Sequence, residues 1–178
     1  MDMAITSGTA ELNNSTGIYT LAQLKGLIVA DPAKWRSLVF TNGCFDLLHP
    51  GHVRYLQAAK ALGKTLVVGL NSDRSVMAIK PAKPGQPQRP IITELYRAEV
   101  LAALRSVDGV VIFEERTADN LIKTLQPDIY VKGGDYSIDT LPEAASVRAY
   151  GGKIELIQVE LPTSTTAIIQ KIMNSGNK

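Results

Sequence analysis

The sequence predicts an α/β fold in which an open, mainly parallel five-stranded sheet is covered by helices on both faces. Strand-like and helix-like segments alternate along the chain, and several strand-like runs are continuously apolar, as in parallel strands that are buried on both sides. A chain of 178 residues is also long enough to bury one sizeable core. Because such a Rossmann-like sheet binds its ligands beyond the carboxyl ends of its strands, functional residues are expected there.

The expected elements follow from short apolar runs and from apolar residues at helical spacing. The strands are expected at residues 38–41, 65–70, 110–113, 128–131 and 153–159. The helices are expected at residues 20–29, 51–62, 73–79, 92–105, 117–125, 142–149 and 165–173, with Thr20 as the cap of the first. Residues 1–17 are rich in Thr, Ser, Asn and Gly without an apolar period, so we expect a flexible tail and a single domain over residues 18–178.

Residues 80–90 are expected to form a loop, because they hold four prolines, three cations and no acidic residue. Two interpretations remain open from the sequence. The segment is either a solvated connector or a cationic flap over an anionic ligand.

Composition excludes several classes of protein. A formal net charge of +2 without an arginine-rich stripe gives no reason to expect nucleic acid as a partner. The single cysteine, Cys44, cannot form a disulfide framework and favours a reducing compartment. No apolar run reaches the roughly 18 residues of a membrane span, and residues 1–7 lack the pattern of a signal peptide. We therefore expect a cytoplasmic protein without a membrane partner.

Two common nucleotide-binding motifs are not met. Gly63-Lys64-Thr65 resembles the end of a P-loop, but Ala58 stands where the leading glycine belongs, and the segment runs from helix to strand rather than the reverse. No G-x-G-x-x-G follows the first strand, which disfavours a dinucleotide-binding oxidoreductase.

The strongest functional signal follows the first strand, where residues 41–52 read TNGCFDLLHPGH. The only two histidines of the chain, His49 and His52, stand three residues apart there. Pro50 suits the first position of a helix and His49 the cap before it, so both imidazoles should lie on one face near a helix N-terminus. Gly51 leaves room for a ligand between them. Free amides and two imidazoles at this point are suited to phosphate oxygens.

Other uses of this segment are weaker. A zinc site is poorly supported, because only Cys44 and Asp46 could join the two histidines, so no metal site is expected. Cys44 is expected to be structural, since no third group completes a Cys-His nucleophile. Two histidines that merely cap and pack remain the simpler alternative.

His-x-Gly-His after a strand that ends in Asn-Gly-x-Phe-Asp resembles the signature of the nucleotidylyltransferase superfamily. Within its cytidylyltransferase-like members, the chain is most similar to the domain that makes an ADP-heptose, the D-glycero-D-manno-heptose 1-phosphate adenylyltransferase domain. The similarity covers about residues 20–173. Its further matches are Asn71-Ser72-Asp73, Lys80, Arg89-Pro90, Arg97, Val107-Asp108, Val131-Lys132-Gly133-Gly134-Asp135-Tyr136 and Ser164-Thr165-Thr166.

The resemblance implies a Mg²⁺-dependent enzyme that transfers AMP from ATP to a sugar 1-phosphate, with a separate sugar kinase upstream and a homo-oligomer, a dimer, as the assembly. It implies catalysis by His49, His52 and Lys80. It implies nucleotide binding by Thr41, Asn42, Gly43, Cys44, Phe45, Gly51, Lys132, Gly133, Asp135, Ser164, Thr165 and Thr166. It implies substrate binding by Asp46, Asp73 and Arg97. A cytidylyltransferase that uses glycerol 3-phosphate and a non-catalytic nucleotide-binding module are the alternatives.

On the residues alone, several of these positions have simpler interpretations. Lys132 to Asp135 could be a plain turn after a strand, Ser164 a helix cap, and Lys80 and Arg97 solvated charges. The sequence also departs from the family at residues 161–163, which read Leu-Pro-Thr where relatives usually have a turn with glycine.

Overall fold

The computed structural model describes residues 16–82, 84–134, 137–159 and 163–175. In these ranges the sheet has five strands, all parallel, in the order β3-β2-β1-β4-β5. The strands are β1 (Leu38–Gly43), β2 (Thr65–Asn71), β3 (Gly109–Phe113), β4 (Ile129–Gly133) and β5 (Lys153–Ile157). The expected α/β class and its five strands are confirmed. β1 and β4 run two residues further than expected, which brings Asn42 and Lys132 into the strands themselves.

The seven expected helices are confirmed, with ends that differ by a few residues. They are α1 (Leu21–Ala30), α3 (Pro50–Lys60), α4 (Asp73–Ile79), α5 (Glu94–Ala102), α6 (Asp119–Leu125), α7 (Ala144–Arg148) and α8 (Thr165–Ser175). Sequence reasoning missed two short elements, α2 (Pro32–Trp35) and a 3₁₀ turn over Ile138–Thr140. Thr20 caps α1 as expected, since its hydroxyl accepts a hydrogen bond from the amide of Gln23.

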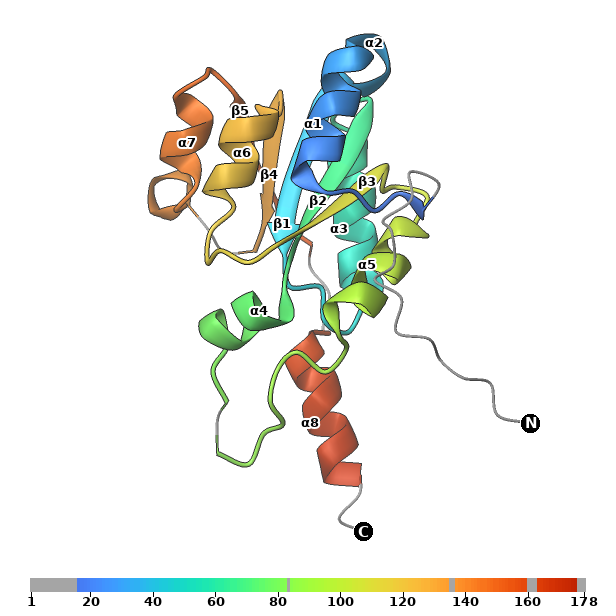
Figure 1. The fold of residues 1–178 in the computed structure, drawn as a ribbon. Helices are drawn as coiled ribbons and strands as arrows, with labels where there is room; N and C mark the ends of the chain where they lie inside the picture. The colour runs from blue at the N-terminus through green and yellow to red at the C-terminus, as the bar shows by residue number, and fades with distance from the viewer. Residues whose placement is uncertain (1–15, 83, 135–136, 160–162, 176–178) are drawn as a thin grey trace, which may run out of the picture.

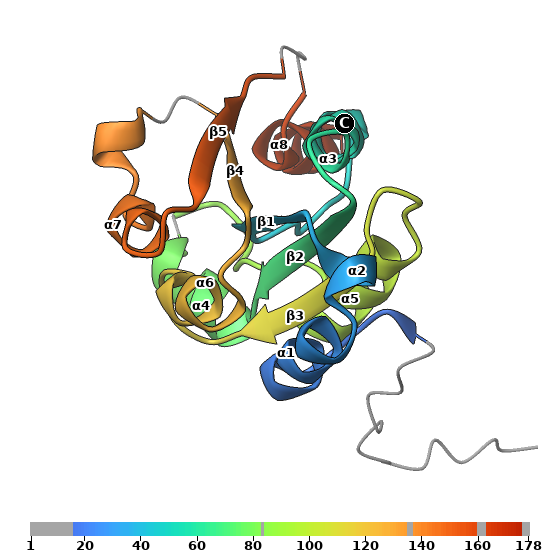
Figure 2. The same ribbon diagram turned by 90° about the horizontal axis from the view of Figure 1, so that it is seen from above.

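The sheet has an apolar core on each face, because successive side chains of a strand point to opposite sides. Phe40 belongs to the core under α1, α6 and α7, while its neighbour Val39 belongs to the core under α3 and α5. Seen from above, the helices lie on both sides of the twisted sheet (Figure 2). β2 is buried along its whole length, as its continuously apolar sequence predicts.

The chain joins the sheet just before α1. The carbonyl of Gly17 accepts a hydrogen bond from the amide of Val110, and the amide of Tyr19 donates to the carbonyl of Val110. The sheet contacts therefore start one residue before the expected domain boundary. Residues 1–15, most of the expected tail, lie outside the described residues.

Strands β1 and β4 pair with each other, and the direction in which successive strands are added to the sheet reverses between them. At such a switch point the connecting segments leave to opposite faces, so a crevice opens at the carboxyl ends of these strands. Figure 1 shows α4, α8 and the segment between α4 and α5 gathered at this end of the molecule. The residues that follow β1 and β4 therefore meet at one site.

Candidate active site

A pocket of about 440 Å³, the size of a small-ligand site, lies at this crevice. It is lined by Asn42, Gly43, Cys44, Phe45, Asp46, His49, Gly51, His52, Tyr55, Lys80, Arg89, Lys132, Gly133, Gly134, Ile157, Gln158, Val159, Thr163 and Thr165. The motif after β1, the end of β4 and the start of α8 thus share one cavity although they are distant in sequence.

The two histidines lie together at the start of α3. Pro50 is the first helical residue, and Nδ1 of His49 accepts a hydrogen bond from the amide of Gly51 at 3.2 Å. The centroids of the His49 and His52 rings are 3.9 Å apart. The expectation of two imidazoles on one face of a helix N-terminus is confirmed.

Burial keeps this pair uncharged. It lowers the pKa of His49, and it lowers the pKa of His52 to about 4, with smaller contributions from His49 and Lys80. Nδ1 of His52 is buried and has no hydrogen-bond partner among the described residues, which leaves Nε2 as the nitrogen with access to the pocket. Near pH 7 the pair is therefore two neutral imidazoles, each able to donate one N–H to an anionic ligand.

The loop between β1 and α3 is held in a constrained shape. Phe45 has a positive φ of 42°, which is uncommon for a residue with a side chain. Its ring is buried beside His52, with 5.4 Å between the ring centroids, and it would lie 3.0 Å from a Cβ at Gly43. The strained turn directs the chain from the end of β1 into the helix that carries both histidines.

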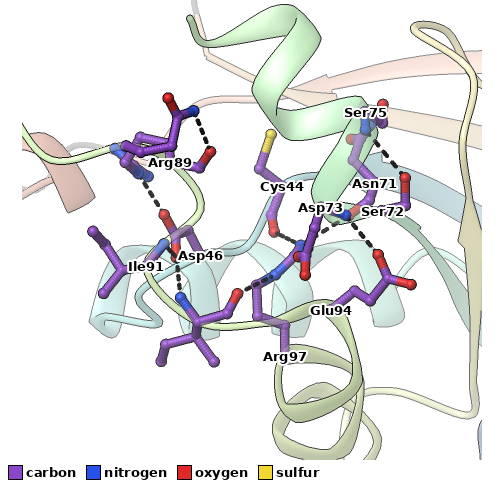
Figure 3. Close-up of polar contacts among 12 residues, drawn as sticks. Cys44, Asp46, Asn71, Ser72, Asp73, Ser75, Arg89, Ile91, Glu94 and Arg97 are labelled. Atoms are coloured by element: carbon purple, nitrogen blue, oxygen red, sulfur yellow. Dashed lines mark hydrogen bonds and ion pairs between the residues drawn. The ribbon is translucent and has the colours of Figure 1, made fainter. Parts of the chain in front are cut away.

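Asp46 anchors the segment that follows the 80–90 loop (Figure 3). Its buried carboxylate accepts hydrogen bonds from Nε of Arg89 and from the amides of Ile91 and Ile92, the last two at 2.8 and 3.1 Å. Arg89 lines the pocket, as does Lys80 at the other end of the loop. The loop thus places a basic side chain at the cavity from each of its ends, with that of Arg89 paired to Asp46, and the flap interpretation stays a prediction.

Arg97 is the centre of a second set of contacts (Figure 3). Its side chain is fully buried and donates hydrogen bonds to four groups, whose distances are 2.6 Å for the carbonyl of Cys44, 2.9 Å for that of Asn71, 2.8 Å for that of Ile92 and 2.7 Å for the Asp73 carboxylate. Neither Arg97 nor Asp73 lines the pocket. The structure therefore shows Arg97 tying together the chain segments beside the pocket, rather than a solvated charge.

The end of β4 brings a cation and a tightly packed backbone to the pocket. Lys132 and Gly133 line the cavity, and a Cβ at Gly133 would come within 2.8 Å of the Tyr55 ring. Gly134 has a φ of 98°, which disfavours any side chain. Asp135 lies outside the described residues.

Thr41 and the start of α8 support the pocket from its edges. The hydroxyl of Thr41 is fully buried, 2.7 Å from the hydroxyl of Tyr55, and does not line the cavity. Ser164 caps α8 by accepting a hydrogen bond from the amide of Ala167, while Thr165 lines the pocket and donates to the carbonyl of Leu47. Thr166 is exposed outside the lining.

Sequence reasoning missed several lining residues. Tyr55 stands one helical turn after His52 and could have been found from that spacing. Gln158 and its neighbours lie just past β5, where any residue at the carboxyl edge is a candidate, but no residue type marked them.

The all-parallel strand order, the crevice between β1 and β4 and the paired histidines at a helix start define a Rossmann-like α/β protein with its candidate site at the switch point of the sheet. The chain belongs to the cytidylyltransferase-like family, whose model matches residues 40–172.

The chain is also similar to curated relatives. The chain is 48% identical over 171 residues to the bifunctional protein HldE of Geotalea uraniireducens, a match that covers 96% of this chain and 34% of the relative. It is 48% identical over 158 residues to HldE of Geobacter sulfurreducens, covering 89% of this chain and 31% of that protein. The chain therefore spans about a third of the length of these relatives.

Among solved structures, the lipopolysaccharide core biosynthesis protein of Thermoplasma volcanium is similar with a TM-score of 0.55 and 27% identity. The match covers 71% of this chain and 98% of that chain.

Two further findings concern the described ranges only. No three His, Cys, Asp or Glu side chains in these ranges are grouped so that they could hold a metal ion. None of the helices in the same part of the chain is long and apolar enough to cross a membrane.

Proposed function

We propose that this chain transfers AMP from ATP to a heptose 1-phosphate, releases pyrophosphate and forms an ADP-heptose. One observation carries the proposal: the neutral His49–His52 pair faces a pocket at the switch point that also holds Lys80, Arg89 and Lys132. Neutral donors and fixed cations around one cavity suit two polyanionic substrates that must be brought together.

The chemistry needs no strong base. A phosphate oxygen of the sugar attacks the α-phosphorus of ATP in line, a new oxygen–phosphorus bond forms, and the bond to the leaving pyrophosphate breaks. His49 and His52 donate hydrogen bonds to the phosphate oxygens that gain charge, and Lys80 neutralises the triphosphate. The amides around Phe45, in the constrained turn that lines the pocket after β1, are proposed to bind the same phosphate oxygens.

The sugar is assigned from the residues around β4 and α8. The run Lys132-Gly133-Gly134-Asp135-Tyr136 and the Ser164-Thr165-Thr166 start of α8 resemble the heptose branch of the family, and the curated relatives are named HldE. Similarity to a lipopolysaccharide core biosynthesis protein supports a sugar substrate as well. Asp135 is proposed on the nucleoside side of the site.

Arg97 and Asp73 are proposed to act on the substrate site indirectly, since both are engaged with each other. Asp46 lines the pocket, but its carboxylate is occupied by the 89–92 segment, so an indirect role is proposed for it as well. These three residues would keep the pocket in shape for the sugar phosphate.

A CTP-dependent enzyme that acts on glycerol 3-phosphate is the second candidate, favoured by the description of the family as cytidylyltransferase-like. The intact histidine pair argues against a module that only binds nucleotide. A pyrophosphate-release assay with ATP, CTP and GTP against several sugar phosphates tests the proposal. Release with ATP and the heptose supports it, and no release with any pair contradicts an enzymatic function.

The remaining partners are part of the same proposal. Mg²⁺ would enter with the triphosphate as part of the substrate. The sugar 1-phosphate requires a sugar kinase upstream, proposed as a separate activity, and the assembly is proposed to be a dimer. A cytoplasmic location is favoured by the use of ATP and by the lone cysteine, Cys44.

A further inference from the structure

A buried carboxylate lies behind the wall of the nucleotide pocket and is not part of the lining. Glu143 stands just before α7, and only 4% of its side chain is exposed. Its Oε1 accepts hydrogen bonds from Nδ2 of Asn42 at 3.5 Å and from the amide of Ala118 at 3.4 Å, while its Oε2 has no partner among the described residues. A buried charge held by such long contacts needs a counter-charge.

That counter-charge is Lys132, at the end of β4. Its ammonium lies 3.9 Å from Oε1 of Glu143 and donates a hydrogen bond to Oδ1 of Asn42 at 3.0 Å. The same Oδ1 accepts from the Tyr130 hydroxyl at 2.7 Å, so the Asn42 amide is fixed in one orientation. Asn42 and Lys132 both line the pocket. The network therefore connects a residue outside the cavity to a cation on its wall.

We propose that Glu143 is a positioning residue for the nucleotide site, whose carboxylate acts through the ion pair and through Asn42 to hold the Lys132 ammonium at the pocket wall. The proposal rests on the proposed nucleotidyl transfer and adds to it a residue that does not touch the substrate.

The ion pair with Glu143 also affects the protonation of Lys132. Burial lowers its pKa, and the negative charge of Glu143 opposes this effect. Cys44 is the other titratable group in the described structure that acts on it, and the Tyr130 ring centroid lies 6.0 Å from the ammonium. Without the Glu143 charge, Lys132 should lose its proton at a lower pH and with it part of its attraction for the nucleotide.

The test is a double-mutant cycle on nucleotide affinity, measured by calorimetry from pH 6.5 to 9.5 with ATP, and with CTP where CTP is the better ligand. Glu143→Gln should weaken binding about tenfold at the alkaline end and much less at pH 6.5, so that the alkaline decline begins at a lower pH. In a Lys132→Met background, Glu143→Gln should add little, because the carboxylate acts through the lysine.

Two controls accompany the cycle. Glu155→Gln makes the same chemical change in an ion pair with Lys153, away from the pocket lining, and should leave the pH profile unchanged. Cys44→Ser tests the thiol: Cys44 lines the pocket, so only the pH dependence of the affinity is compared, and the alkaline decline should remain, which assigns it to Lys132.

The outcomes separate the two proposals. Equal affinity of wild type and Glu143→Gln at every pH overturns the positioning role alone, and so do losses that are additive with Lys132→Met and independent of pH. If Glu143→Gln does not fold, Glu143→Asp replaces it; a smaller shift of the same sign supports the role, and an unmoved profile overturns it. Absence of any nucleotide binding by the wild type contradicts the proposed function itself and removes the basis of this inference.

Discussion

Replacing Arg97 by methionine should destabilise the fold before it affects any ligand. Arg97 has no exposed side-chain surface and donates to three backbone carbonyls and to Asp73. Methionine retains much of the apolar volume but leaves all four acceptors without this donor. Each orphaned buried acceptor costs about 1–3 kcal/mol, and removing one partner of a buried ion pair costs about 3–5 kcal/mol.

The expected total is smaller than the sum of these terms. The Asp73 side chain is 31% exposed, so water can solvate it once the guanidinium is gone, and the loops can relax. We expect the free energy of unfolding to fall by about 4 kcal/mol in Arg97→Met. Arg97→Lys keeps the charge without the planar fork and should cost about 2 kcal/mol.

Urea denaturation at pH 7 measures this effect, with the m-value as a check on two-state behaviour. Arg74→Met is the matched control, because Arg74 pairs with Glu114 in an exposed ion pair in which the two side chains are 83% and 71% exposed. It should change the free energy of unfolding by less than about 0.5 kcal/mol. An Arg97→Met protein as stable as this control, but unable to bind nucleotide, would refute the reasoning and put Arg97 on the ligand.

Two further predictions concern the histidines. His52→Ala should lower kcat roughly 100-fold or more in a protein that remains folded by circular dichroism, because a donor aimed at developing charge acts mainly in the transition state; unchanged turnover would remove His52 from the mechanism. His52 also links stability to pH. Its pKa is about 4 in the folded protein and near 6.5 when unfolded, so the unfolded state gains a proton between these values and stability falls as the pH drops from about 6.5 to 4. Urea midpoints at pH 7 and pH 4.5 should differ more for wild type than for His52→Gln, and equal differences would contradict the buried, neutral His52.

Local signals in the sequence were sufficient for most of the fold and for the centre of the site. The apolar runs identified the strands, and Pro50 after His49 marked the helix start that places both imidazoles. These features depend on neighbours within a few residues. The ends of β1 and β4 were missed, because Asn42 and Lys132 are polar residues that continue the strands into the crevice.

The surroundings of the site depended on contacts between distant segments, and no local pattern indicates these. Arg97 has the sequence context of a solvated helix residue, yet it is buried where segments around Cys44, Asn71 and Ile92 meet. Glu143 follows a proline in an ordinary helix start, and only the fold brings it to Lys132. A charged residue of this kind can be assigned only after the topology is known.

The central claim is the transfer of AMP from ATP to a heptose 1-phosphate, and product identification under competition tests it most directly. The protein is given equal ATP and CTP with heptose 1-phosphate or glycerol 3-phosphate, and the products are identified by mass. The proposed function predicts that an ADP-heptose dominates, with pyrophosphate released in equal amount. A dominant CDP-glycerol would contradict the sugar and base assignments, and a CDP-heptose would contradict the base assignment alone.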